Sequence, residues 1–374
     1  MTEASVNYVI DVLKGIKPLI EPEWFEVLGF LECHRISGLF YSKSKELEIN
    51  LPHKIDKILN QIFKVQKRRV EILSGNVKEI SARLLKDQVK HVFLKGSVFN
   101  NVNNKLGLYQ LGERTSNDID ILVNSEEITK ISRSLKELGF IQGKYDEDSN
   151  AIIPFCRKEI LERRMNRGEV APFIKLTNNP EVPFIEVDVN FSLGNTPDDD
   201  IKLLDYMIDN SLIINDKFPL TILDNELFLI QLLMHQYKEA TLYFMVSRSK
   251  DIDLYKLADI YYLIKNKAFK KIKFKELSKK FKLSQKIGFV LNQVAEVFDD
   301  NEFKKYAANF KFKEPLIIDY DDKKEYQMTA STRFRLKVFN SKSYLLEVTK
   351  KPYYRWEFPF GYFRGNRRWL VKRN

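Results

Sequence analysis

Two aspartates in an apolar, β-branched run place the tightest constraint on how this chain can fold. The run reads Asp118-Ile119-Asp120-Ile121-Leu122-Val123. Residues two apart in a β-strand point to the same face, so Asp118 and Asp120 project together. Neighbouring carboxylates repel each other and are costly to bury unless a cation lies between them. Because Mg²⁺ prefers hard oxygen ligands, this strand predicts a magnesium site that also binds substrate phosphates.

A second short motif precedes the two aspartates in the sequence. Lys95-Gly96-Ser97 follows a short apolar segment that reads as a strand, and Arg114 lies just before the acidic run. Lys95 offers a positive charge, Gly96 lets the backbone approach a ligand closely, and Ser97 offers a hydroxyl. Either motif alone is a weak signal, but together and in this order they indicate a site for phosphate groups.

A third strand further along the chain also carries acidic residues. Segment 184–191 alternates strictly between apolar and polar residues. Its polar members Glu186, Asp188 and Asn190 therefore share one face of a strand. Polar groups on an otherwise buried strand must be solvated, paired or functional. Glu186, Asp188 and Asn190 are therefore candidates for a functional site.

The motifs resemble those of a known group of enzymes. The Gly96-Ser97 turn followed by Asp118-Ile119-Asp120 resembles the polymerase β-like nucleotidyltransferase superfamily. The fuller pattern, with Lys95 and Arg114, is most similar to a branch of poorly characterised bacterial nucleotidyltransferases. The resemblance implies an α+β fold: a polymerase β-like nucleotidyltransferase core of mixed sheet and helices, flanked by N-terminal and C-terminal helical regions.

The resemblance also implies a reaction. A metal-dependent enzyme of this kind moves a nucleoside monophosphate from a nucleoside triphosphate to a hydroxyl or similar acceptor and releases pyrophosphate. Asp118, Asp120 and Asp188 are the implied catalytic residues and metal ligands for two Mg²⁺ ions, with Mn²⁺ as an alternative. Asp188 is also the implied general base. The related proteins often carry a histidine and an aromatic residue after this third acid, whereas Asn190-Phe191 stands here.

The implied nucleotide-binding residues come from three parts of the chain. Ser97 and the Gly96 backbone are expected to bind the β and γ phosphates, with Lys95 and Arg114 in support. Lys256 either pairs with Asp259 on one helix face or lines the nucleotide cleft. ATP is the favoured nucleotide, and the acceptor is a small molecule, a peptide or protein, or RNA. The alternative is a non-catalytic nucleotide- or RNA-binding module that uses the basic aromatic tail.

The chain divides into four segments by composition and periodicity. They are an N-terminal helical region (1–88), a nucleotidyltransferase α/β core (89–195), a helical lobe (196–310) and a basic aromatic C-terminal tail (311–374). The first segment ends in a long amphipathic helix expected from Pro52 to Leu85. His34 and His235 are expected to be structural rather than catalytic.

The tail carries two signals. Alternating apolar residues in segment 334–348 predict two strands or a hairpin. From Lys350 onward, Lys and Arg are interleaved with Tyr, Trp and Phe. Such a segment can dock back on the protein with its aromatic rings buried. It can also bind RNA, an acidic partner or an anionic membrane surface.

Composition limits the class of protein. The formal net charge of +11 favours anionic partners, although a solvated basic surface without a specific partner gives the same value. Cys33 and Cys156 are isolated, so neither a zinc site nor a disulfide framework is indicated. The N-terminus does not resemble a signal peptide, and no apolar run approaches the roughly 20 residues of a membrane span. We therefore expect a cytoplasmic protein.

Overall fold

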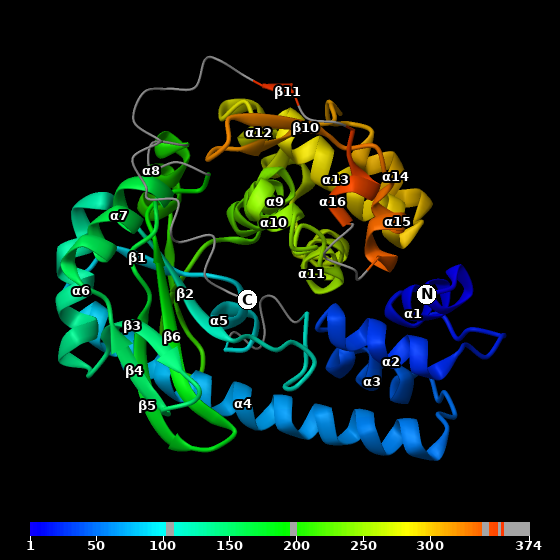
Figure 1. Ribbon diagram of the computed structural model, residues 1–374, viewed down its shortest axis with the longest axis horizontal. Coiled ribbons are helices and arrows are strands. Elements are labelled where there is room, and N and C mark those ends of the chain that lie inside the picture. Colours follow the sequence, from blue (N-terminus) through cyan, green and yellow to red (C-terminus); the bar gives the residue numbers. More distant parts are fainter. Residues whose placement is uncertain (102–107, 195–199, 339–343, 351–352, 355–374) are drawn as a thin grey trace.

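A computed structural model describes residues 1–101, 108–194, 200–338, 344–350 and 353–354. A mixed sheet lies on one side of the molecule, and two groups of helices lie opposite it (Figure 1). Most of the basic aromatic segment after Lys350, and part of the loop between Asn100 and Gly112, lie outside the described residues. In the described part, no helix is both long enough and apolar enough to cross a membrane.

The sheet has six strands in the order β1-β2-β6-β5-β3-β4. The strands are β1 (His91–Phe93), β2 (Asp118–Val123), β3 (Ile141–Asp146), β4 (Ala151–Pro154), β5 (Phe173–Asn179) and β6 (Val182–Asn190). Strands β2 and β6 run parallel, and every other neighbouring pair is antiparallel. The expected α+β fold with a mixed sheet is confirmed.

Alternation along β2 and β6 decides which face of the sheet is buried. Ile119, Ile121, Val187 and Val189 are at most 1% exposed. Burying each of these side chains contributes about 1.5–3 kcal/mol. Because side chains alternate, the same burial turns the acidic residues of both strands to the opposite face. The hydrophobic residues of these strands therefore fix the direction of the carboxylates.

Four helices form the N-terminal region: α1 (Glu3–Leu13), α2 (Trp24–Cys33), α3 (Ser37–Glu46) and α4 (His53–Lys86). Helix α4 is about 50 Å long and runs from this group to the sheet, where it contacts β6 (Figure 1). Its bounds agree with the prediction. Helices α2 and α3 are separated by a short break, where Arg35 adopts a positive φ of 54°.

The second helical group follows the sheet in the chain. Before this group the chain forms α8 (Ile201–Asp209), which lies beside the sheet in Figure 1, and the antiparallel pair β7 (Leu212–Asn215) and β8 (Pro219–Ile222), of which β8 contacts β1 and α4. The helices of the group are α9 (Asn225–Thr241), α10 (Tyr243–Val246), α11 (Leu254–Lys265), α12 (Lys271–Lys280), α13 (Ser284–Phe298) and α14 (Asn301–Ala307). Asp224 caps α9 by accepting a hydrogen bond from the Leu227 N–H at 2.9 Å. Helix α9 is buried around most of its circumference, as its apolar sequence predicts.

The segment after this group differs from the prediction. Its elements are β9 (Leu316–Asp319), β10 (Lys324–Gln327), α15 (Thr332–Lys337), α16 (Tyr344–Val348) and β11 (Tyr353–Tyr354). The predicted strands or hairpin across 334–348 are wrong, since α15 and α16 stand there. Ser331 caps α15, and the buried residues Tyr344 and Val348 lie four apart. Short apolar runs satisfy the strand period and the helix period equally well.

Four further elements complete the core. They are α5 (Lys95–Phe99), the 3₁₀ turn η1 (Ser125–Glu127) with α6 (Ile128–Glu137), and α7 (Arg157–Arg167). Helix α6 covers the apolar face of the sheet together with α4 (Figure 1). Helix α7 contains the basic stretch that follows Cys156.

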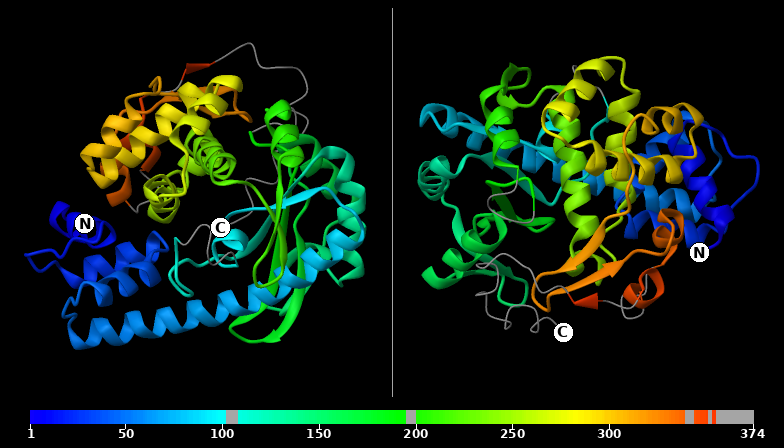
Figure 2. Two further views of the ribbon diagram at one scale, coloured as in Figure 1. Left: turned by 180° about the vertical axis from the view of Figure 1, so that it is seen from behind. Right: turned by 90° about the horizontal axis from the view of Figure 1, so that it is seen from above.

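The two ends of the described chain meet at a buried histidine. The Leu254 N–H donates to His34 Nδ1 at 3.3 Å, so Nε2 carries the hydrogen and donates to the Leu336 carbonyl at 2.9 Å. His34 therefore joins the end of α2 to α11 and α15, and Figure 2 shows α1 beside the C-terminal elements. Glu3 adds ion pairs to Arg333 and Lys337. His34 thus has the structural role that the sequence suggested.

This histidine predicts a dependence of stability on pH. Burial lowers the pKa of His34 below its unfolded value of about 6.5. The unfolded chain therefore takes up the proton first, and the contribution of His34 is complete above about pH 6.5 and is lost as the pH falls through the folded pKa. In urea unfolding between pH 7.5 and 5.5, the wild type should lose more unfolding free energy than His34→Gln. The difference in slope is at most about 1.4 kcal/mol per pH unit. Equal slopes would contradict this role.

Candidate active site

Three carboxylates from two neighbouring parallel strands meet at the polar face of the sheet. Asp118 and Asp120 lie on β2, and Asp188 lies on β6 directly opposite Asp120. One oxygen of each carboxylate lies within 4.8 Å of those of the other two. Asp120 is buried, while Asp118 and Asp188 are partly exposed. The strand pair therefore brings together the three acids that the sequence singled out.

The charges within this cluster fit a divalent cation. Burial raises the pKa of Asp188 well above its usual range, and the negative charges of Asp118 and Glu186 raise it further. Burial also raises the pKa of Asp120, although Lys95 opposes the shift. Carboxylates that repel one another in this way become favourable as ligands of a hard divalent ion. Asp118, Asp120 and Asp188 are thus the residues able to hold a catalytic metal.

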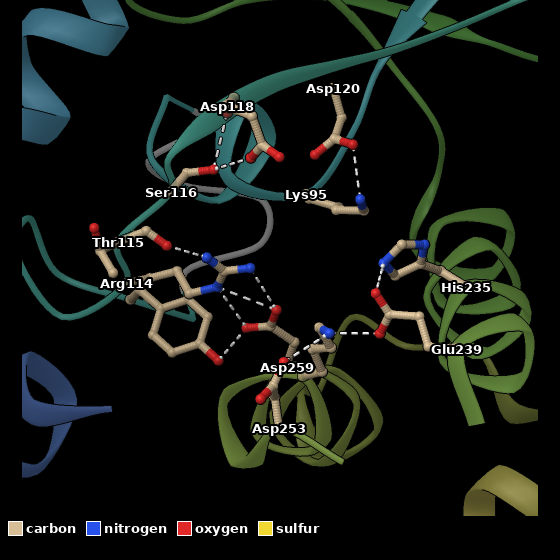
Figure 3. Close-up of polar contacts among 12 residues, drawn as sticks. Lys95, Arg114, Thr115, Ser116, Asp118, Asp120, His235, Glu239, Asp253 and Asp259 are labelled. Atoms are coloured by element: carbon tan, nitrogen blue, oxygen red, sulfur yellow. Dashed lines mark hydrogen bonds and ion pairs between the residues drawn. The ribbon is translucent and has the colours of Figure 1, made fainter. Parts of the chain in front are cut away.

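Lys95 supplies the positive charge that is already present at the cluster. Its Nζ donates to Asp120 Oδ1 at 2.7 Å (Figure 3). Burial lowers the pKa of Lys95, but the charges of Asp120 and Asp118 outweigh this effect and the net shift is upward. Lys95 is therefore a charged partner of the carboxylates at every physiological pH.

Gly96 allows the first turn of α5 to approach the acidic strand. A Cβ at this position would lie 2.5 Å from the Cβ of Ser116. Ser116 in turn donates its hydroxyl to the Asp118 carbonyl at 2.9 Å, with Asp118 Oδ1 at 3.1 Å (Figure 3). Ser97 is 4% exposed, and its hydroxyl lines a small cavity shared with Asp118 and Asn101. The motif is thus placed beside the acids, with Gly96 required for the contact.

Arg114 connects the acidic strand to the helical lobe. Its guanidinium contacts both carboxylate oxygens of Asp259 on α11, with Nη2 at 3.0 Å from Oδ2 (Figure 3). The Tyr109 hydroxyl donates to the same carboxylate at 2.7 Å. The Arg114 and Asp259 side chains are 7% and 2% exposed. The sequence suggested that Asp259 pairs with Lys256, but the structure gives this carboxylate to Arg114.

Lys256 belongs to a second charged group on α9 and α11. It forms ion pairs with Glu239 and with Asp253, the latter at 2.8 Å. His235 Nε2 lies 3.2 Å from Glu239 Oε1, and Figure 3 shows His235 on the side of Lys95. Burial lowers the pKa of His235, as does the positive charge of Lys95. Glu239 was missed from the sequence, although its spacing of four from His235 places the two on one helix face.

The family of the chain is identified by a match that covers most of its length. A family model described as uncharacterised nucleotidyltransferase matches residues 21–299. The chain belongs to this nucleotidyltransferase family. The matched range includes the three aspartates, Lys95 and Lys256, so the resemblance seen in the motifs is confirmed. No curated protein and no solved structure matches the chain.

Membership of the nucleotidyltransferase family indicates the kind of substrate and metal that the acidic cluster serves. Nucleotidyltransferases act on nucleoside triphosphates and generally use divalent metals. The acids on β2 and β6 are of the kind that binds such an ion, since Mg²⁺ takes one or two carboxylates together with substrate phosphates.

The close approach at Gly96 predicts the effect of one added methyl group. In Gly96→Ala the new Cβ would collide with Ser116 and displace α5 or the start of β2, at a cost of about 1–3 kcal/mol in unfolding free energy. Gly75→Ala is the matched control, because a Cβ in this helix meets no atom within 4 Å. The control should gain about 0.5–1 kcal/mol in the same urea titration. Equal effects of the two substitutions would contradict the account.

The Arg114–Asp259 pair predicts a strongly non-additive double-mutant cycle. Arg114→Met leaves the Asp259 carboxylate buried without its ion pair and should cost about 3–5 kcal/mol in unfolding free energy. Adding Asp259→Leu should recover much of that loss. The exposed pair Arg68–Glu181 is the control and should show a coupling below about 1 kcal/mol. Additive effects at Arg114 and Asp259 would show that their contact does not stabilise the fold.

Proposed function

We propose that this nucleotidyltransferase moves a nucleoside monophosphate from a nucleoside triphosphate to a hydroxyl or similar acceptor and releases pyrophosphate. The observation that carries the proposal is the cluster of Asp118, Asp120 and Asp188, whose oxygens lie within 4.8 Å of one another. Two Mg²⁺ ions are the proposed cofactor, and ATP is the nucleotide to be tested first. The acceptor is a small molecule, a peptide or protein, or RNA.

The three aspartates have two proposed roles, metal binding and acceptance of a proton. Asp118, Asp120 and Asp188 would hold the divalent metal, which when bound stabilises the attacking and leaving oxygens. Asp188 is the proposed acceptor of the proton of the acceptor hydroxyl, since its carboxylate lies in the same cluster. The acceptor oxygen then forms a bond to the α-phosphorus as the bond to the bridging oxygen breaks. The electron pair of that bond leaves with pyrophosphate.

The remaining residues bind the phosphates or position the site. Lys95, the Gly96 backbone and Ser97 lie beside the acids and are the proposed phosphate contacts. Arg114 and Lys256 already have carboxylate partners on the helical lobe. We therefore assign Arg114 to holding the lobe against the sheet and Lys256 to joining α9 to the start of α11 within the lobe.

Transfer to an acceptor tests the function directly. Cell extract, Mg²⁺ and each α-³²P-labelled nucleoside triphosphate are incubated with the protein, and RNA, protein and small-molecule fractions are separated. The wild type should label one fraction, and Asp118→Asn should reduce the labelling by at least ~10²–10³-fold, the usual scale for losing one preorganised charge.

Asp146→Asn is the control for this assay, because Asp146 is an exposed acid on β3 of the same sheet. This variant should label like the wild type. Wild-type labelling by Asp118→Asn would contradict the assignment of the site. Metal-dependent binding of a nucleotide without any labelled product would favour the alternative of a nucleotide-binding module.

A further inference from the structure

Two arginines of the N-terminal helices lie near the acidic cluster without a carboxylate partner. Arg35 lies between α2 and α3, and Arg69 lies near the middle of α4. Both side chains are partly buried. Within the described part of the chain, neither guanidinium forms an ion pair, whereas the adjacent Arg68 is paired with Glu181 at 2.6 Å. Arginine side chains are almost never fully buried unless they are paired, so these two stand out from the paired arginines around them.

The part of α4 that carries Arg69 lies beside Asp118, because Val70 and Leu73 line the same small cavity as Ser97 and Asp118. Burial lowers the pKa of Arg69, the positive charge of Arg35 lowers it further, and Asp118 raises it. Its Nε is buried and has no hydrogen-bond acceptor among the described residues. Leaving such a donor unsatisfied costs about 1–3 kcal/mol. Arg69 therefore has donors to offer to an anion bound near Asp118.

Arg35 lies over an aromatic ring of α11 that Arg114 also approaches. Its Cζ lies 5.0 Å from the ring centroid of Tyr255, and the Cζ of Arg114 lies 4.6 Å from the same centroid. Tyr255 is on α11, the helix that also carries Asp259. Stacking on this ring orients the guanidinium without neutralising its charge. Arg35 also adopts a positive φ, at the break between α2 and α3, which is a conformation that costs energy for a residue other than glycine.

The grouping of these charges indicates the class of ligand. Two guanidiniums close together repel each other unless an anion lies between them. The planar guanidinium binds phosphate oxygens through two parallel N–H donors. A phosphoryl group with several oxygens is therefore the ligand that fits both side chains at once.

We propose that Arg35 and Arg69 bind the β- and γ-phosphates of the nucleoside triphosphate. This inference rests on the proposed function and deepens it. Lys95 already neutralises Asp120, whereas Arg69 is on the Asp118 side of the cluster. As the bond between the α-phosphorus and the bridging oxygen breaks, negative charge accumulates on the departing pyrophosphate. Two fixed positive charges at this position stabilise it.

The proposal gives the N-terminal helices a role in the active site. Helices α2, α3 and α4 would bring their arginines to the nucleotide, while β2 and β6 bring the acids. Nucleotide affinity would then depend on the position of these helices relative to the sheet, which the long helix α4 fixes (Figure 1).

Binding of inorganic pyrophosphate tests the proposal without requiring catalysis. Isothermal titration calorimetry with Mg²⁺ compares the wild type with Arg35→Gln and Arg69→Gln. We expect each variant to weaken the affinity for pyrophosphate and for the preferred nucleoside triphosphate by at least ~10-fold, as for loss of one charge-assisted contact. Nucleoside monophosphate affinity should stay unchanged. Arg68→Gln is the matched control on the same helix and should bind like the wild type.

Thermal unfolding establishes that each variant is folded. If Arg35→Gln unfolds because it loses the Tyr255 contact, Arg35→Lys keeps the charge and should still weaken pyrophosphate binding, since Lys lacks the second donor. Wild-type pyrophosphate affinity in the folded Arg35 and Arg69 variants would overturn the proposal. So would a wild type that binds neither pyrophosphate nor any nucleoside triphosphate.

Two outcomes separate this inference from the proposed reaction. Equal weakening of monophosphate and pyrophosphate binding would assign the arginines to another phosphate, such as one on the acceptor, and would overturn the proposal. A wild type that binds pyrophosphate through Arg35 and Arg69 but labels no acceptor would instead contradict the transfer reaction and leave the arginine site in place.

Discussion

Repulsion among three carboxylates is the constraint on which the rest of this structure depends. Pairing of β2 with β6 sets Asp120 opposite Asp188, and Asp118 shares their face of the sheet. The apolar residues on the other face keep this arrangement, because a shift by one residue would turn Ile119 and Val187 out of the core. The surrounding positive charges follow from that constraint. Lys95 contacts one acid directly, and Arg69 lies near another.

Buried ion pairs determine how the helical lobe faces the sheet. Arg114 and Asp259 join the segment before β2 to α11, and Arg335 and Asp251 join α15 to the segment before α11. Such pairs add little net stability, since each charge must first be removed from water. Their geometry is specific, however, because a misplaced lobe would leave buried charges without partners. The ion pairs therefore fix the position of the lobe opposite the acids more than they strengthen the fold.

The sequence was informative where function depends on local periodicity. Spacing of two within β2 placed Asp118 and Asp120 on one face, and alternation within β6 placed Glu186, Asp188 and Asn190 on one face. The family resemblance was needed to choose Asp188 as the third acid. Partners that are distant in sequence were not accessible. Lys256 and Asp259 looked like a pair because they share a helix face. In the structure, Lys256 pairs with Glu239 and Asp253, and Asp259 pairs with Arg114. Arg35 and Arg69 carried no local signal, because their surroundings, Tyr255 for Arg35 and the cavity beside Asp118 for the part of α4 that carries Arg69, come from distant parts of the chain. Helices α15 and α16 were missed since short apolar runs fit two periods.

The central claim is that Asp118, Asp120 and Asp188 together form one divalent metal site. Electron paramagnetic resonance of Mn²⁺ titrated into the protein, with a non-hydrolysable nucleoside triphosphate present, measures that site directly. Asp188 is the most informative position, because it lies on a different strand from the other two acids. The account predicts that Asp188→Asn weakens Mn²⁺ affinity by at least ~10-fold, while the exposed Asp146→Asn leaves it unchanged. Equal Mn²⁺ affinity in the wild type and Asp188→Asn would contradict it.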